Sequence, residues 1–290
     1  MKQMNKILVA TDFSQESDNA VLLANYLQKK LGATVTMIHI SDVSPVWDWP
    51  ASDIQAKNLL GQFQKEITTS LDRKMEEQVI RCGVKFEGMI KFGNSQKELL
   101  KEIQSTKAEL LVMGHRGQTG FFGIGSLAEK MIASSPIPVL VVKNKKDIKN
   151  ITSLIDPAKV SQEAITYTQD LANSLNGKAQ YLTFIADLSS ETLNPFTMSQ
   201  YKFSEEEKSQ ITERAKSFIL DQVKNIPEED VHIEISNLRV AKALAKGLID
   251  QKTDLAIVSK HNRGPLEKLF VGSTSKGVLQ EFDGNILVLP

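Results

Sequence analysis

The chain of 290 residues is long enough for roughly two domains of about 150 residues each, and its 41% hydrophobic and 24% charged content is ordinary for a globular protein. Its 35 basic and 35 acidic residues leave no net charge that would favour nucleic acid or an anionic membrane surface. Cys82 is the only cysteine, so no internal disulfide can form, and no apolar stretch reaches the roughly 18 residues of a membrane helix. We therefore expect a cytoplasmic protein that recognises its partners at specific sites.

The first half of the chain alternates between short apolar runs and amphipathic segments. Ser14 is placed to cap a helix that ends near Gly32. The apolar runs predict strands at residues 6–10, 34–40, 84–92, 109–114 and 138–143. The segments with helical spacing predict helices at residues 15–32, about 54–81, 95–108 and 126–135. Such an alternation is typical of a parallel sheet that is covered on both faces.

The second half of the chain repeats the first. A constant offset aligns residues 6–40 with the segment that begins at residue 150, and a second match follows later in each half. The equivalent pairs include Asp12 and Asp156, Ala20 and Ala164, and Gly125-Ser126 and Gly272-Ser273. With the polar stretch at residues 143–150 as a linker, this duplication predicts domains at residues 1–145 and 146–290.

Each half is expected to be a doubly wound α/β domain with a five-stranded parallel sheet. In such sheets, ligands bind beyond the carboxyl ends of the strands, where the strand order reverses. Asp12 follows the first strand, and the glycine-rich segment GHRGQTGFFGIGS at residues 114–126 follows the fourth. Both are therefore expected on the same rim of the sheet.

The glycine-rich segment raises the question of what its backbone approaches so closely that a β-carbon would be in the way. Gly114 and Gly117 would let backbone amides point at phosphate oxygens. Gly125, Ser126 and Leu127 open a helix whose amides and dipole favour an anion. This pattern indicates phosphate binding.

Polar side chains beside this segment fit a nucleotide. His115 and Arg116 are placed to meet phosphate from the side, and Asp12 can accept hydrogen bonds from ribose hydroxyls or an adenine amine. Simpler structural roles compete with these. Asp12 could be a helix-capping or turn residue, Arg116 a solvated loop charge, and the remaining glycines of the segment could simply make a tight loop.

Four segments, ILVATDFS, VMGHRG, GSLAEKMI and PVLVV, occur in this order and resemble the universal stress protein family. The resemblance covers essentially the whole chain as two tandem copies. The ATP-binding branch of that family has the pattern Gly-x2-Gly-x9-Gly-Ser/Thr. The first half of this chain has Gly114-x2-Gly117 and Gly125-Ser126, with seven intervening residues instead of nine.

The resemblance implies an adenine-nucleotide α-hydrolase-like fold and binding of ATP or ADP together with Mg²⁺. It implies that Ala10, Thr11 and the backbone near Ile40 form the pocket for the base. The full set of nucleotide-binding residues that it implies is Ala10, Thr11, Asp12, Ile40, Met113, Gly114, Arg116, Gly117, Gly125, Ser126 and Leu127.

Catalysis is not expected from this sequence. The four histidines share no metal-ligand spacing, no Gly-x4-Gly-Lys-Ser/Thr motif of a P-loop NTPase occurs, and no nucleophile with its base is apparent. Cys82, near the end of a predicted helix, is expected to be an inert thiol. The first hypothesis is therefore a cytoplasmic ATP-binding regulatory module of the stress response with unknown protein partners. A weak ATP hydrolase or phosphotransferase, and a non-nucleotide interaction scaffold whose shortened loop excludes ATP, are the alternatives.

The second half has lost part of the predicted site. Ser259 and Asn262 stand where the first half has its paired glycines, and Pro157 follows Asp156 directly and removes an amide. Full ATP binding is therefore expected only in the first half. A phosphate could still rest at the helix that begins near Gly272, beside Lys260, His261 and Arg263.

The final strand of each half, residues 137–143 and 285–290, is expected at an edge of its sheet, where unpaired backbone groups invite another strand. Single-domain members of the resembled family commonly dimerise through this edge. We therefore expect an internal pseudo-dimer in which the two domains are related by a pseudo-two-fold axis. A homodimer of the whole chain is a further possibility.

Overall fold

The computed structural model describes residues 4–41, 54–116, 125–156, 161–186, 203–222, 226–236, 238–260 and 273–290. Residues 2–146 form one compact unit, and residues 147–289 form the other. We refer to them as the first and the second unit. No described helix is both long and apolar enough to cross a membrane.

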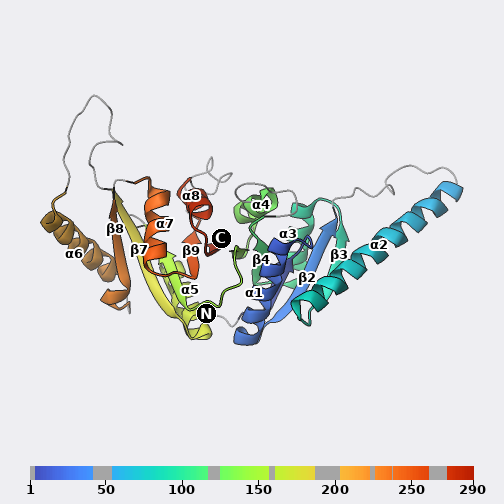
Figure 1. Cartoon of the computed structure of the whole chain (residues 1–290), viewed down its shortest axis with the longest axis horizontal. Helices are drawn as coiled ribbons and strands as arrows, with labels where there is room; N and C mark the ends of the chain where they lie inside the picture. The colour runs from blue at the N-terminus through green and yellow to red at the C-terminus, as the bar shows by residue number, and fades with distance from the viewer. Residues whose placement is uncertain are drawn as a thin grey trace, which may run out of the picture. The chain divides into compact units, whose positions relative to one another are not determined.

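The first unit is a five-stranded parallel sheet in the order β3-β2-β1-β4-β5 (Figure 1). Its elements are β1 (Lys6–Ala10), α1 (Gln15–Leu31), β2 (Thr34–Ser41), α2 (Ile54–Cys82), β3 (Glu87–Phe92), α3 (Ser95–Thr106), β4 (Leu110–Gly114), α4 (Ser126–Ser134) and β5 (Val139–Val142). The chain moves outward from β1 through β2 to β3, then crosses back to β4 and β5. Because parallel crossovers are right-handed, this reversal places α1 and α2 on one face and α3 and α4 on the other.

The second unit repeats this arrangement with the order β10-β9-β6-β7-β8, again with parallel pairs. Its elements are β6 (Asn150–Leu154), α5 (Gln162–Leu175), β7 (Lys178–Ala186), α6 (Glu205–Gln222), the 3-10 helix η2 (Glu228–Asp230), β8 (Val231–Ser236), α7 (Val240–Asp250), β9 (Leu255–Ser259), α8 (Ser273–Glu281) and β10 (Asn285–Leu289). The predicted fold class, two tandem doubly wound parallel sheets, is confirmed. The pseudo-two-fold relation between the domains stays a prediction.

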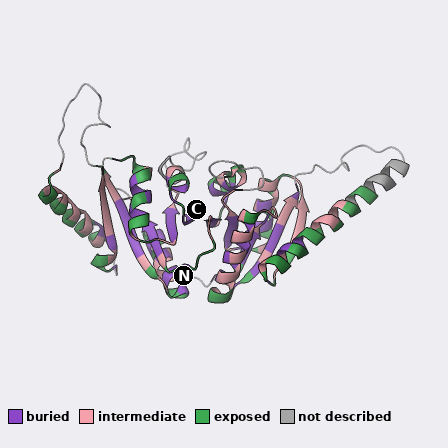
Figure 2. Ribbon diagram, viewed as in Figure 1, coloured by how far each residue is buried: buried purple, intermediate pink, exposed green. Residues whose placement is uncertain are grey.

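The strands form where the sequence has unbroken apolar runs. All four residues of β5 and all five of β10 are buried, as expected for parallel strands with helices on both faces (Figure 2). Helix ends also follow local signals: Ser14 caps α1 by accepting a hydrogen bond from the amide of Ser17, and α1 ends at Gly32, which has a φ of 69°.

The predicted start of the third strand is wrong. The strand expected at residues 84–92 begins only at Glu87, because the amide of Val84 donates to the carbonyl oxygen of Val79 at 3.1 Å and so closes the carboxyl end of α2. Gly83, with a φ of 63°, makes the left-handed turn that this closure requires. The apolar Val84 therefore belongs to the end of α2 and not to the strand.

Candidate functional site

The strand order of the first unit reverses between β1 and β4, and the predicted site residues lie on this switch point. Ala10, the last residue of β1, lies between its register partners Ile38 on β2 and Met113 on β4. Asp12 follows β1, and Gly114 ends β4. Since the strands are parallel, both lie beyond the carboxyl ends of adjacent strands, where ligands bind in such sheets. Ile40 lies further from β4, at the end of β2 and opposite Lys91 on β3.

Asp12 is held by a turn that leads into α1. Its Oδ1 accepts hydrogen bonds from the amide of Ser14 at 3.1 Å and from the hydroxyl of Ser14. The hydroxyl oxygen of Ser14 in turn accepts from the amide of Ser17 at 3.2 Å. Asp12 is therefore a turn residue, and its half-buried carboxylate has a fixed orientation at the rim.

The amide, hydroxyl and carbonyl groups of Thr11 all form hydrogen bonds within the protein. Its amide donates to the carbonyl oxygen of Ile38 at 2.9 Å, and its buried hydroxyl lies 2.7 Å from Oε1 of Gln78 on α2 and accepts from the amide of Phe13 at 3.0 Å. Its carbonyl oxygen accepts a hydrogen bond from Nδ1 of His39 at 2.9 Å. Thr11 therefore shapes the turn around Asp12.

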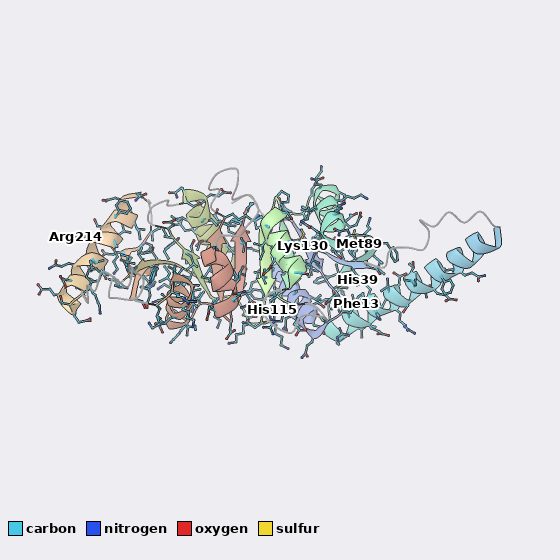
Figure 3. All side chains as sticks on the ribbon, turned by 90° about the horizontal axis from the view of Figure 1, so that it is seen from above. Phe13, His39, Met89, His115, Lys130 and Arg214 are labelled. Carbon is cyan, nitrogen blue, oxygen red and sulfur yellow. The ribbon has the colours of Figure 1, made fainter. Side chains whose placement is uncertain are left out.

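Phe13 and His39 form an aromatic pair beside Asp12 that the sequence analysis missed. Phe13 has a φ of 66°, which for a bulky side chain costs on the order of 1–2 kcal/mol, and its ring stacks on His39 with centroids 4.3 Å apart and planes tilted by 30° (Figure 3). Because a carbonyl only accepts, the hydrogen bond to Thr11 assigns a proton to Nδ1 of His39. A strained residue that persists is characteristic of functional sites. The only signal for this pair in the sequence is the position of Phe13 directly after Asp12.

Gly114 makes a close contact within the protein. A β-carbon at this position would lie 3.1 Å from the carbonyl oxygen of Glu16 and 3.2 Å from that of Arg116. The first turn of α1 thus packs directly on the end of β4. At Gly114, the glycine-rich segment therefore lies close to the backbone of Glu16. Gly117 lies outside the described residues.

His115 links the end of β4 to the start of α4. Its amide donates to Val142 on β5 at 3.0 Å, and its carbonyl oxygen accepts from the amide of Gly125 at 2.7 Å. Its Nδ1 is buried and has no hydrogen-bond partner within the described part of the chain. Burial, followed by the charges of Arg116 and Lys143, lowers the pKa of His115 from its ordinary value of 6.5. The imidazole of His115 therefore stays neutral, has an unpaired buried nitrogen and lies near the positive charges of Arg116 and Lys143.

Helix α4 begins without a side-chain cap. Its N-cap is Gly125, whereas Ser14, Asn94 and Ser161 provide side-chain caps for α1, α3 and α5. The first amides of α4, on Ser126 and Leu127, have no hydrogen-bond acceptor from a cap. Uncapped amides and the helix dipole attract an anion, and the positive charges of Arg116 and Lys143 near His115 act in the same direction.

The described residues hold no cluster of three or more acidic, histidine or cysteine side chains that could bind a metal ion. The arrangement can accept hydrogen bonds at Asp12 and donate them to an anion at α4. The acceptor at Asp12 and the donors at α4 lie on opposite sides of the switch point.

Comparison with known proteins agrees with this geometry. The profile of the universal stress protein family matches residues 4–143 and again residues 147–290. The chain belongs to the universal stress protein family. Its two units are thus two tandem universal stress protein domains, and membership of this family supports a role in the stress response.

One relative matches half of the chain, and another matches nearly all of it. The universal stress protein MJ0531 of Methanocaldococcus jannaschii is 34% identical over 143 residues, which cover 49% of this chain and 83% of the relative. A universal stress protein of Mycolicibacterium smegmatis is 24% identical over 295 residues and matches 98% of this chain and 96% of its own length. Among solved structures, that of a universal stress protein from Archaeoglobus fulgidus has a TM-score of 0.61 at 16% identity and covers 99% of this chain and 96% of its own. This last similarity supports the fold.

The second universal stress protein domain departs from the first at the same rim. Its helix α5 ends at Asn176, which is equivalent to Gly32, but spans 14 residues where α1 spans 17. Helix α5 therefore begins at Gln162, the equivalent of Asp18, three positions later than α1. Ser259, which replaces Gly114, carries a side chain in a place where the first domain has the backbone of Glu16. The domain without the glycine is thus also the domain whose first helix starts later.

The remaining predicted groups of the second domain are only partly described. Asp156 follows β6 as Asp12 follows β1, but Pro157, His261, Asn262, Arg263 and Gly272 lie outside the described residues. The hydroxyl of Ser259 is buried and has no hydrogen-bond partner among the described residues, and burial lowers the pKa of the half-buried Lys260. In place of the polar Thr11, this domain has the buried Ile155. The two rims therefore differ in chemistry.

Proposed function

We propose that the first domain binds ATP or ADP with Mg²⁺ at this rim and that the protein acts as a regulatory module of the stress response with little or no turnover. The observation that carries the proposal is the uncapped start of α4, with the unpaired Nδ1 of His115 nearby, next to the rigidly held Asp12 across the switch point. The first group suits phosphates, and the second suits a hydroxylated sugar.

The residues of this rim fit the parts of a nucleotide. The amides of Ser126 and Leu127 would donate to phosphate oxygens, and Asp12 would accept from ribose hydroxyls. The stacked rings of Phe13 and His39 offer an aromatic surface near Asp12 on which a base can pack. Mg²⁺, when bound with the nucleotide, would neutralise part of the phosphate charge.

Little turnover is expected from such a site. Backbone amides at a helix start bind a phosphate in its ground state about as well as in a transition state, so they supply affinity without lowering the barrier. Efficient hydrolysis additionally requires a positioned base and charge stabilisation that grows in the transition state. The site is thus suited to sensing a nucleotide.

Calorimetry with the full chain tests the proposal. ATP or ADP with Mg²⁺ should bind with a stoichiometry near one per chain, and Asp12→Asn should weaken binding by about tenfold, the loss that follows from weakening hydrogen bonds to a charged acceptor. Asp156→Asn, the equivalent change in the second domain, is the matched control and should leave the affinity within about twofold.

Two results would redirect the proposal. Absence of adenine-nucleotide binding in calorimetry, together with no nucleotide released when the purified protein is denatured, would favour an interaction scaffold. Hydrolysis at about 1 s⁻¹ or faster that survives rigorous purification would favour a weak ATP hydrolase or phosphotransferase.

A further inference from the structure

Gln78 is a buried amide on a helix that is otherwise largely exposed. Among the described side chains of α2, only Met75 and Gln78 are buried, and Gln78 is 0% exposed (Figure 2). Met75 lies against Gly88 of β3: a β-carbon on Gly88 would be only 2.7 Å from Cγ of Met75. A fully buried amide needs hydrogen-bond partners, so its contacts indicate what it does.

The amide of Gln78 connects α2 to both sides of the Asp12 turn. Its Nε2 donates to Oδ1 of Asp18 at 2.7 Å and lies 3.2 Å from the hydroxyl of Ser17, both in the first part of α1. Its Oε1 accepts from the hydroxyl of Thr11 at 2.7 Å. Because a carboxylate only accepts, the contact with Asp18 fixes which end of the amide faces Thr11.

The same contacts set the geometry of the turn. The hydroxyl oxygen of Thr11 that donates to Gln78 also accepts the amide hydrogen of Phe13, the residue with a positive φ. Asp12 lies between Thr11 and Phe13, so its backbone is fixed on both sides, while Ser14 holds its carboxylate. Movement of Gln78 would therefore reach the Asp12 turn through the hydroxyl of Thr11 and through the start of α1.

Packing alone does not require this polar arrangement. In the second domain, Ile155 stands in the position of Thr11, and its amide donates to Leu182 at 2.8 Å as that of Thr11 donates to Ile38. Ile155 belongs to an apolar cluster that includes Ile219 of α6, the counterpart of α2. In the second domain, the residue after β6 is therefore joined to the long helix α6 by apolar side chains, within the same fold. The polar connection is present in the domain whose rim retains the predicted nucleotide residues.

We propose that Gln78 is a positioning residue that couples α2 to the nucleotide site by holding Thr11 and the turn around Asp12. This inference rests on the proposed nucleotide binding of the first domain. A ligand that engages Asp12 stabilises the turn, and the turn stabilises the part of α2 around Gln78. The amino-terminal part of α2 extends away from the sheet of its own domain, so this helix is placed to report occupancy of the site (Figure 1).

Hydrogen exchange of the full chain, with and without Mg²⁺-ATP, tests the coupling together with calorimetry. In the wild type, ATP should slow exchange of the amides at residues 75–82. Gln78→Leu keeps the size of the side chain and removes both ends of the amide, while Asp18 retains its two hydrogen bonds from Arg81 at 2.7 and 2.8 Å. This variant should raise the Kd for ATP about five- to tenfold, because the turn that presents Asp12 is no longer held by Gln78, and should abolish the slowing in α2.

Met75→Leu is the matched control, because it changes the other buried residue of α2 with little change in volume, and it should leave both the Kd and the slowing unchanged. The coupling is wrong if the wild type binds ATP without any change of exchange in α2, a result that needs no folded variant. It is equally wrong if Gln78→Leu binds ATP within twofold of the wild type. A wild type that binds no ATP would instead overturn the proposed function, and the coupling with it.

Discussion

The carbonyl oxygen of Glu16 lies 3.1 Å from the point that a β-carbon on Gly114 would occupy. The close approach joins the first turn of α1 to the end of β4, the two elements that flank the switch point of the sheet. In the second domain the equivalent helix starts one turn later, and the glycine is replaced by Ser259. Gly114 is thus explained by the scaffold of the site, without reference to a ligand.

Gly114→Ala should therefore destabilise the first domain by about 1–3 kcal/mol, because the obstructing atom belongs to a helix backbone that cannot turn aside. Urea denaturation followed by far-UV circular dichroism measures the change. Ser259→Ala at the equivalent position is the control. It removes a buried hydroxyl without a partner and should cost less than about 0.5 kcal/mol or stabilise the protein. A loss for Gly114→Ala that is as small as that expected for Ser259→Ala would show that the contact with Glu16 is easily relieved.

Ser126→Pro should weaken nucleotide binding while leaving α4 intact. Ser126 is the first residue of α4, where proline is favoured, and Gly125 has a φ of −62° and a ψ of 143°, which a following proline accepts. The change deletes one amide that is proposed to face phosphate, so calorimetry should show a Kd about tenfold higher. Ser126→Ala, which keeps the amide, should have a clearly smaller effect. If both variants bind alike, the helix start does not hold the phosphates.

His115 should make the protein less stable in acid. Its pKa in the folded protein is lowered from 6.5, so below about pH 6.5 the unfolded chain takes up a proton that the folded protein does not. The stability that the neutral imidazole contributes is present above this pH and is lost as the pH falls toward the folded pKa, with a slope of at most about 1.4 kcal/mol per pH unit. Denaturation between pH 5 and 8 should show a weaker pH dependence for His115→Gln than for the wild type. Burial also lowers the pKa of His232, so this residue likewise makes the protein less stable in acid. His232 is present in both the wild type and the variant, and its effect does not account for a difference between them.

The sequence predicted what depends on neighbouring residues. The unbroken apolar runs of β4 and β5, and the cap at Ser14, identified the strands of the switch point and the start of α1. They placed Asp12 at the carboxyl end of β1, beside the end of β4, as the structure has it, and the alternative that Asp12 is a turn residue agrees with its hydrogen bonds to Ser14.

What the sequence did not predict depends on contacts between distant residues. Gln78 is 67 residues from Thr11 and lies on a helix with few buried side chains, so its burial has no local signal. The positive φ of Phe13 likewise follows from the bonds of Thr11 and from stacking on His39. The constant offset between the halves holds at Gly32 and Asn176 but conceals the later start of α5, because an alignment does not show where a helix begins.

Cys82 should react slowly with thiol reagents in the folded protein. It ends α2, and burial, followed by the negative charge of Asp18, raises the pKa of its thiol from 9.0 to about 11. Because the thiolate is the reactive form, a shift of this size lowers its population near pH 8 by roughly a hundredfold relative to the unfolded chain. Alkylation with iodoacetamide, followed by mass spectrometry with and without urea, measures the ratio. Asp18→Asn removes the nearby charge, so it should speed alkylation of the folded protein several-fold, while a folded protein that reacts as fast as the unfolded chain would contradict the assignment of an inert thiol.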